Sequence, residues 1–300
     1  MLSKTVKAHL ALLGANLIYG VNYSIAKLVM PGFIEPFGFI FCRVLGALLL
    51  FWGLHAFMKS EKIDRKDYWR LFICGAFGVA GNQLSFFYGL NITTPINAAI
   101  IMTSNPVLVL IMSSIILKER ISGIKLGGIF LGLSGAVGLI LFNNSLSIST
   151  ENIAGDLFIF INATSYAIYL VLVKPLMNKY QPITVMKWVF LFGFLFVFPF
   201  GFNQFTEIDW NSFTSNTWLA FLFVVIATTF FAYLFNIYAL KSVNPSVVSI
   251  YIYSQPIVAT MVALLIGQDE LNLLKIVSAL MIFVGVYMVS RKPKLKTVSN

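Results

Sequence analysis

The sequence predicts an all-α membrane protein with ten transmembrane helices, arranged as two inverted repeats of five helices. Composition is the first observation: 59% of the 300 residues are hydrophobic and 11% are charged, where a soluble domain would carry roughly a quarter charged residues. The apolar residues also form long runs, as crossing about 30 Å of hydrocarbon requires. Finally, the second half of the chain repeats features of the first at a spacing near 150 residues.

The apolar runs define the elements in order. The predicted spans are 8–29, 36–57, 69–90, 95–117, 123–142, 155–174, 183–203, 217–240, 246–267 and 273–290. The first run is too long for the apolar part of a signal peptide and has no small-residue cleavage site, so we interpret it as the first span. The connections are short and polar, which leaves the chain divided into repeats at 1–142 and 155–290 and a basic tail at 291–300.

Basic residues predict the orientation of these spans. With the N-terminus inside, 17 Lys and Arg residues fall on the inner side, and only Lys275 falls on the outer side. Bacterial-type membrane proteins concentrate Lys and Arg in cytoplasmic connections. The sequence therefore predicts a multi-pass protein of the bacterial-type inner cell membrane with both termini, and the basic tail, in the cytoplasm. The same distribution argues against a nucleic-acid partner, because the basic residues flank spans instead of forming one patch.

The internal repeat predicts how the two halves are related. Pairs offset by 150 residues are Pro95 and Pro245, Tyr88 and Tyr238, Asn105-Pro106 and Gln255-Pro256, and Gly135 and Gly285. The first and sixth spans match at an offset of 147, from Lys27 to Lys174. Each half holds an odd number of spans, so the halves cross the membrane in opposite senses. Folds of this kind bind their solutes near the midplane, where the repeats meet.

Two prolines indicate where that midplane site lies. Pro106 follows Pro95 by 11 residues, which is about 16 Å along a helix and roughly half the hydrocarbon thickness. Pro256 has the same depth in the ninth span. Each proline removes one helical hydrogen bond, so backbone carbonyls are freed in the membrane. Either neighbouring Ser and Thr hydroxyls satisfy them in a packed kink, or they line a polar cavity, and the matched pair favours the cavity.

Polar side chains within the spans predict the lining of the cavity, because such groups are costly in lipid. A stripe on the first span and further groups on the third, fourth, sixth, eighth and ninth form the candidate solute-binding set: Asn16, Tyr19, Asn22, Tyr23, Gln83, Tyr88, Asn97, Asn105, Tyr169, Tyr233, Asn236, Tyr253 and Gln255. Aromatic walls with neutral hydrogen-bonding groups suit a small amphipathic solute. The competing interpretation is plain hydrogen bonding between helices, worth about 0.6 kcal/mol per pair.

Charged residues within the spans suggest how an anion is held and how transport is driven. Lys27 and Arg43 both lie in the outer half and are candidate contacts for a solute carboxylate. Lys27 also fits a side chain that extends to the outer interface, and Arg43 also fits pairing with carbonyl groups. Two carboxylates, those of Glu119 and Asp156, lie at span ends. The absence of a deeper one argues against a buried proton relay.

Longer segments resemble a known family. The segments are "LLGANLIYGVNYSIAK", "RVLGALLLF", "FYGLNITTPINAAIIMTSNPVLVLIMSSIILKERISGIKLGGIFLGLSGAVGLI" and the echo "YALKSVNPSVVSIYIYSQPIVATMVALLIGQDELNLLKIVSALMIFVGVYMV". With them the chain resembles the EamA-type transporters of the drug/metabolite transporter superfamily. The resemblance implies a carrier, often an exporter, of amino acids or other small metabolites. Two departures are Tyr19 before Gly20, where the family often has Trp, and Val189 and Phe190 in place of a second Arg43.

The expected function is therefore transport of small organic metabolites such as amino acids, by alternating access at a midplane cavity. A multidrug or nucleotide-sugar carrier is the alternative within transport, and a membrane scaffold that transports nothing is the alternative outside it. The sequence lacks the motifs of an intramembrane enzyme or a metal site, so we expect no catalysis, cofactor or metal. Glycines at 127, 128, 132, 135, 138 and 285 predict close packing, either within the protein or between copies, and the oligomeric state stays open.

Overall fold

The computed structural model describes residues 4–58, 61–117, 123–142 and 150–290, so the basic tail and Glu119 lie outside it. Within these ranges every regular element is helical. The first half holds α1 (Lys4–Lys27), α2 (Pro36–Ala56), α3 (Arg65–Gly75), η1 (Ala76–Gly81), α4 (Asn82–Ile92), α5 (Pro95–Met102), α6 (Asn105–Leu117) and α7 (Gly123–Phe142). The second holds α8 (Thr150–Met177), α9 (Pro182–Thr206), η2 (Trp210–Ser212), α10 (Ser215–Leu222), η3 (Phe223–Phe231), α11 (Ala232–Leu240), α12 (Pro245–Ile250), η4 (Tyr251–Tyr253), α13 (Ser254–Ile266) and α14 (Leu273–Ser290).

The two halves repeat one order of elements. Helix α3 runs into the π-helical turn η1 and then α4, and α10 runs into the π-helical segment η3 and then α11. The predicted spans 69–90 and 217–240 missed these π segments, since nothing in their apolar runs marks a change from i−4 to i−5 hydrogen bonding. Such segments are rare and occur often at functional sites, and both lie beside the cavity described below.

The predicted spans 95–117 and 246–267 are each broken shortly before a proline, Pro106 or Pro256. The first consists of α5 and α6, and the second of α12, the 3-10 turn η4 and α13. Side-chain hydroxyls take up carbonyl groups at both breaks: Thr103 and Ser104 donate to Ile100 and Ile101 at 2.6 and 2.7 Å, and Ser254 donates to Tyr251 at 2.8 Å. These three bonds go to carbonyl groups beside the breaks and not to those of Met102 and Ile252, which lie four residues before the prolines. Met102 and Ile252 both line the cavity.

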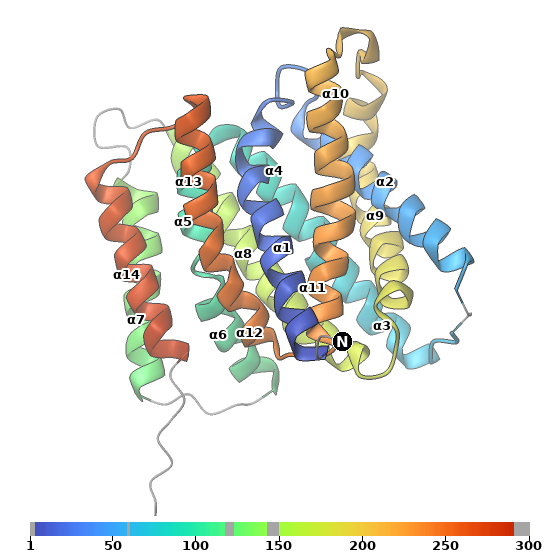
Figure 1. Cartoon of the computed structure of the whole chain (residues 1–300), viewed down its shortest axis with the longest axis horizontal. Helices are drawn as coiled ribbons and strands as arrows, with labels where there is room; N and C mark the ends of the chain where they lie inside the picture. Colours follow the sequence, from blue (N-terminus) through green and yellow to red (C-terminus); the bar gives the residue numbers. More distant parts are fainter. Residues whose placement is uncertain (1–3, 59–60, 118–122, 143–149, 291–300) are drawn as a thin grey trace, which may run out of the picture.

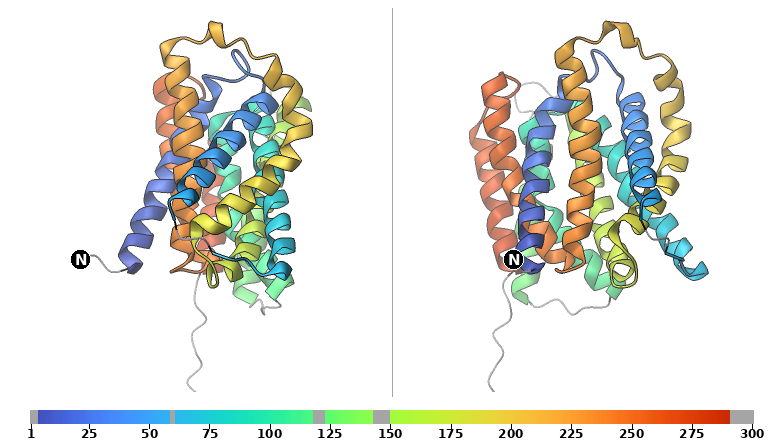
Figure 2. Two further views of the ribbon diagram at one scale, coloured as in Figure 1. Left: turned by 90° about the vertical axis from the view of Figure 1, so that its right-hand side faces the viewer. Right: turned by 45° about the vertical axis from the view of Figure 1, so that its right-hand side comes forward.

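The helices form one bundle in which partners come from both halves. At one edge α7 lies beside α14, and toward the other edge α2 packs on α9, as Figures 1 and 2 show. Between them α1 packs on α11 and α13, while α8 packs on α4 and α6. The central helices α1 and α8 therefore each pack on helices of the other half, which brings residues far apart in sequence to one place.

The number of spans is supported in part. Within the described ranges, seven segments are long and apolar enough to cross a membrane: Pro36–Ala56, Arg65–Ile92, Pro95–Ile116, Ile153–Met177, Pro182–Thr206, Ser215–Leu240 and Val247–Ile266. Two shorter apolar stretches, Leu126–Gly135 and Leu273–Gly285, belong to α7 and α14. Helix α1 has 24 residues and includes three lysines. The count of ten and the opposite orientation of the halves stay predictions.

Two of the glycines pack inside the protein. A side chain at Gly285 would meet the backbone of Gly128 and Gly132 at 2.6 Å, and one at Gly135 would meet the carbonyl oxygen of Ser278 at 2.9 Å. Positions 135 and 285 are the pair offset by 150 residues, so α7 and α14 use equivalent glycines to approach each other. At these two positions the prediction of close packing is confirmed, in its internal form.

Candidate solute-binding site

A cavity of about 60 Å³ lies between helices of both halves. Its lining comes from α1, α2, α4, α5, α8, η3, α11, η4 and α13, and comprises Asn16, Tyr19, Asn22, Tyr23, Arg43, Asn82, Gln83, Phe86, Phe87, Met102, Asn162, Tyr166, Thr228, Tyr233, Ile252 and Gln255. Binding sites for small molecules usually measure about 300–1,000 Å³. The cavity as it stands has room for a few water molecules only, so a solute must part the helices to enter.

A chain of hydrogen bonds joins α1 to α13 along one wall. The Tyr23 hydroxyl donates to Gln255 Oε1 at 2.9 Å, and Gln255 Nε2 donates to Asn16 Oδ1 at 2.6 Å. Asn16 in turn donates to the carbonyl oxygen of Leu12 at 2.8 Å, one turn earlier on its own helix. Each donor is therefore aligned by the next, which fixes the carboxamide of Gln255 at the start of α13, just after the break.

The opposite wall joins α4, α8 and α11. The Tyr233 hydroxyl lies 2.9 Å from Asn82 Oδ1 and 3.0 Å from the Gly78 carbonyl oxygen, and it accepts from Gln83 Nε2 at 3.4 Å. Asn162 Nδ2 donates to the carbonyl oxygen of Asn82 at 2.7 Å. Positions 83 and 233 are equivalent in the repeat and touch each other here, so this contact lies where the two halves meet.

Arg43 is the charged residue of the lining. Its side chain is 2% exposed, its Nε donates to Thr229 Oγ1 at 2.9 Å, and its guanidinium lies 3.8 Å from the centre of the Phe87 ring. Among the described residues, ion pairs form at Lys179 and Lys275 and none forms at Arg43. The cation is therefore stabilised by a hydroxyl and aromatic faces, and its buried Nη1 has no hydrogen-bond partner there.

Further buried polar atoms of the lining also lack hydrogen-bond partners within the described part of the chain. They are the carboxamide oxygens of Asn22, Gln83 and Asn162 and the hydroxyl of Thr228. A buried polar atom without a partner costs about 1–3 kcal/mol. One guanidinium donor and three carbonyl acceptors around one cavity offer contacts for both ends of a small zwitterion.

Eight of the predicted residues line the cavity: Asn16, Tyr19, Asn22, Tyr23, Gln83, Tyr233, Gln255 and Arg43. Asn236 stands just behind them, since its Nδ2 lies 3.4 Å from the Tyr19 hydroxyl and donates to the Ala232 carbonyl at 2.9 Å. The prediction for α1 succeeds because its polar residues are spaced three or four apart, and residues at that spacing share one helix face. Lys27, the last residue of α1, is absent from the lining.

Five other predicted residues lie away from the cavity. The Tyr88 ring stacks on Phe37 at 5.6 Å, and Tyr169 points its hydroxyl at the Met186 sulfur at 3.6 Å. Asn105 donates to the carbonyl oxygen of Ala163 at 2.7 Å.

The remaining two lie near other helices. Asn97 donates to Asp156 at 3.3 Å, and Tyr253 packs on Phe283 at 5.4 Å. Pro106 and Pro256 act only by breaking the helices, because neither lines the cavity. Polarity within a span predicted the burial of Asn97, Asn105 and Tyr169, whereas Tyr88 and Tyr253 are half-buried. It did not predict which neighbour each side chain meets.

Sequence reasoning also missed residues that line the cavity. Phe86, Phe87 and Met102 are indistinguishable by type from the apolar residues that face lipid, and Asn82 and Thr228 lie in or beside the π segments, where the helix phase shifts. Asp156 was placed at a span end, yet it is completely buried and hydrogen-bonded to Thr93 and Asn97. The one residue that could have indicated its burial is Thr93, which lies in the connection to the fourth span and contacts Asp156 in the structure.

The sequence profile of one family matches the chain twice. The EamA-like transporter family accounts for residues 6–141 and for residues 153–291. The chain belongs to the EamA-like transporter family. The two matched segments are the two halves of the bundle, so the recurrence of elements described above is the two-repeat organisation of this family.

Relatives and a solved structure agree with this membership of the EamA-like family. The chain is 25% identical to the "Uncharacterized transporter YyaM" of Bacillus subtilis over 98% of both chains. It is 27% identical to an "Uncharacterized transporter" of Archaeoglobus fulgidus over 91% of this chain and 92% of that one. A solved crystal structure covers 96% of this chain and 98% of its own at a TM-score of 0.64 and 17% identity, which supports the fold alone.

Proposed function

We propose that this EamA-like transporter carries small amphipathic solutes that bear a carboxylate, amino acids above all, as an exporter or facilitator. Arg43 carries the proposal. It is a buried cation at the cavity, with no carboxylate partner among the described residues and one free guanidinium donor. A solute carboxylate would supply the missing anion and a bidentate hydrogen-bonding partner.

The rest of the lining fits the other parts of an amino acid. The free carboxamide oxygens of Asn22, Gln83 and Asn162 are acceptors for an ammonium group, and Phe86 and Phe87 form apolar surface for a side chain. A nucleotide sugar would need several cations around its phosphates, and Arg43 is the single charged residue of this lining. This composition favours amino acids over the nucleotide-sugar alternative.

The mechanism we propose is alternating access, in which the two repeats rock about the cavity. Polar contacts between the repeats, such as Gln83 with Tyr233 and Asn16 with Gln255, surround the cavity and would rearrange as the repeats rock. The small size of the cavity supports a cycle in which the helices part on one side at a time. A scaffold without transport would have no use for buried free donors and acceptors, which cost stability.

Transport measurements on the Arg43→Gln variant test the proposal. Counterflow of a panel of amino acids into proteoliposomes, with and without a pH gradient, should show saturable flux for the native protein. Truncating one partner of a buried charge pair costs about 2–5 kcal/mol, so the variant should lose at least tenfold in affinity for the amino acid. Its response to the decarboxylated amine should change far less.

Lys187→Gln is the matched control, because Lys187 is a buried cation near His55 and Trp52, away from the cavity. Gln255→Ala serves as a second site variant without a charge change. Equal loss for the amino acid and its amine in Arg43→Gln would contradict carboxylate recognition. Full activity of both Arg43→Gln and Gln255→Ala would remove the cavity from the transport path.

A further inference from the structure

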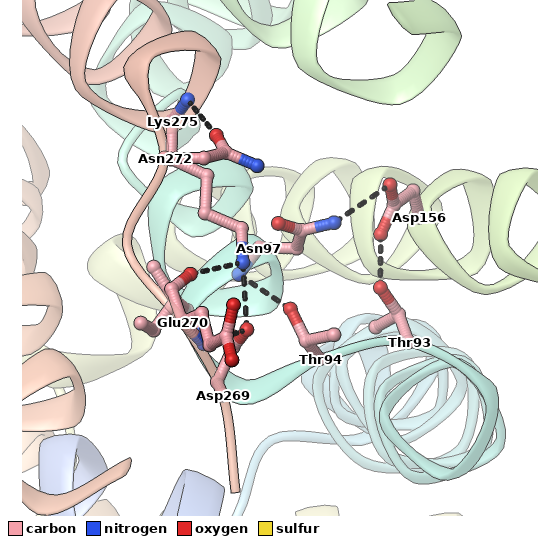
Figure 3. Close-up of polar contacts among 9 residues, drawn as sticks. Thr93, Thr94, Asn97, Asp156, Asp269, Glu270, Asn272 and Lys275 are labelled. Carbon is pink, nitrogen blue, oxygen red and sulfur yellow. Dashed lines mark hydrogen bonds and ion pairs between the residues drawn. The ribbon is translucent and has the colours of Figure 1, made fainter. Parts of the chain in front are cut away.

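Asp156 is a fully buried carboxylate outside the cavity. The first turns of α8 hold it at 0% exposure, where Thr93 donates to one carboxylate oxygen and Asn97 Nδ2 donates to the other at 3.3 Å. Figure 3 shows both contacts as dashed lines, to Thr93 in the connection between α4 and α5 and to Asn97 in the first turn of α5. The group therefore ties the first repeat to the second.

The close approach of two glycines places Asp156 there. A side chain at Gly89 would meet the Gly155 carbonyl oxygen at 2.7 Å, and one at Gly155 would meet the Gly89 carbonyl oxygen at 3.0 Å. The two glycines thus let the backbones of α4 and α8 approach each other closely at this point. Thr93, four residues after Gly89, is thereby held against Asp156, which follows Gly155 directly.

The other buried carboxylates of the described chain have cations, and Asp156 does not. Lys275 pairs with Asp269 at 2.6 Å, and Lys179 pairs with Asp67 at 2.8 Å. Both donors of Asp156 are neutral side chains. A carboxylate that loses water without gaining a cation is the most costly of the three arrangements in its charged form.

The ionisable groups described around Asp156 do not supply it with an ion-pair partner. Lys275 and Asp269 lie beyond Asn97 in Figure 3, where they are bound to each other, and Asp269 also accepts from the Ile96 backbone nitrogen at 3.0 Å. Helix α4 contributes Tyr88, which stacks on Phe37. Helices α5 and α6 and residues 126–142 of α7 have no ionisable side chain in their sequence. The net influence of the paired Lys275 and Asp269 is small because their charges oppose each other.

The site is connected to the cavity through both helices that meet at it. Helix α8 carries Asn162 and Tyr166 of the lining, and Asn162 is six residues, about 9 Å of helix, beyond Asp156. Helix α5 begins beside Asp156 and ends at Met102, another residue of the lining. A change in how α5 packs on the start of α8 therefore reaches the cavity directly.

We propose that Asp156 is a proton-binding site that couples solute movement to the proton gradient. One proton from the water of the outer end forms an O–H bond with the carboxylate and neutralises it. The new O–H donates to Thr93, reversing that hydrogen bond, and the charge that drew Asn97 is gone. On return, the O–H bond breaks and the proton passes to water that reaches Asp156 between α5 and α8 when the protein opens inward.

The sign of the coupling follows from these contacts. The charged form needs both neutral donors and so holds the start of α5 against α8. The protonated form needs them less, so acid outside favours separation of α5 from α8 at the outer end. An inward proton gradient should therefore drive export of the solute. Buried carboxylates serve as relays in other membrane transporters, which is the chemistry assigned here.

Infrared difference spectroscopy of the reconstituted protein tests proton binding without any solute. Between alkaline and acid pH the native protein should gain the carbonyl-stretch band of a protonated carboxyl group. Asp156→Asn should lose that band, and Asp209→Asn, at an exposed residue of the connection before α10, should keep it. The same titration with Na⁺ replaced by choline should leave the band unchanged.

A transport measurement tests the coupling, which rests on the proposed function. With amino acids as solutes, Asp156→Asn should keep exchange at equal pH on both sides and lose net movement driven by a pH gradient. A band that persists in Asp156→Asn, or that Na⁺ displaces, overturns the proton site. Gradient-driven movement equal to the native protein overturns the coupling. An absence of flux in every protein, native included, counts against the proposed function. The infrared result then decides by itself whether Asp156 binds a proton.

Discussion

At the scale of single residues, two buried tyrosines show how one side-chain type has opposite roles. The hydroxyl of Tyr23 is used, because it donates to Gln255 at 2.9 Å. The hydroxyl of Tyr253 is buried without a hydrogen-bond partner among the described residues, and its ring packs on Phe283. Sequence reasoning placed both in the solute site, but only the first lines the cavity.

The same substitution should therefore have opposite effects at these positions. Tyr23→Phe leaves Gln255 Oε1 without its donor and should lower the free energy of unfolding by about 1–3 kcal/mol. Tyr253→Phe removes an unsatisfied buried hydroxyl and should be neutral or stabilising. Thermal melting of the two purified variants in one detergent measures the difference. A lower melting temperature for Tyr253→Phe than for Tyr23→Phe would show that this hydrogen-bond accounting is wrong.

At the scale of elements, the pair α7 and α14 shows how equivalent helices meet. Gly285 approaches the backbone of Gly128 and Gly132, and Gly135 approaches the backbone of α14 at Ser278. Without a hydrophobic force between helices in lipid, such close backbone contact supplies the packing energy. The pair lies at the edge of the bundle in Figure 1, so it depends on this seam more than the central helices do.

Gly285→Ala should open that seam. Its new side-chain carbon would lie 2.6 Å from backbone atoms that cannot rotate away, and overpacking of this kind costs about 1–3 kcal/mol. Gly138→Ala on α7 is the control, since nothing lies within 4 Å of its added carbon. Melting curves should show a loss for Gly285→Ala and no loss for Gly138→Ala. Equal curves would mean that the contact contributes nothing measurable.

At the scale of the whole molecule, polar ties join the repeats at both ends of the bundle. Asp156 binds Thr93 and Asn97 at one end, and Asp67 accepts from Lys179 and Tyr180 at 2.8 Å each at the other. The Asp67 carboxylate beside it raises the pKa of Lys179, so this second tie is a charged pair across the neutral range. Alternating access requires that one such end loosens while the other holds.

The charge distribution predicts which end faces the cytoplasm, and cysteine labelling checks it. With Cys42 and Cys74, both buried and free, replaced by Ala, a single cysteine is placed at Lys62 or at Asp209. Both residues are exposed, and the connections that hold them, from α2 to α3 and from α9 to α10, lie at opposite ends of the bundle in Figure 2. An impermeant maleimide should label Asp209→Cys in intact cells and Lys62→Cys only after permeabilisation. The reverse pattern would invert the orientation, and with it the direction of coupling at Asp156.

Much of the fold follows from local sequence, and much of the site does not. Apolar runs located the segments that α2, α8 and α9 occupy, because helix length and lipid contact depend on each segment alone. The breaks before Pro106 and Pro256 were predictable for the same reason. The π segments were not, since their hydrogen-bond shift depends on the neighbours that accommodate it.

The sequence by itself predicted an all-helical membrane protein of two repeats and the α1 stripe that faces the cavity, and it left Lys27 and Arg43 both as candidate cations. Composition and helical spacing are properties of the chain, so these conclusions needed no partner. Tertiary structure decided that Asn105 and Tyr169 serve packing, that Phe87 stacks on Arg43, and that Asp156 is sealed from water. Those roles depend on which helix lies opposite, because in lipid each buried polar group must find its hydrogen-bond partner within the protein.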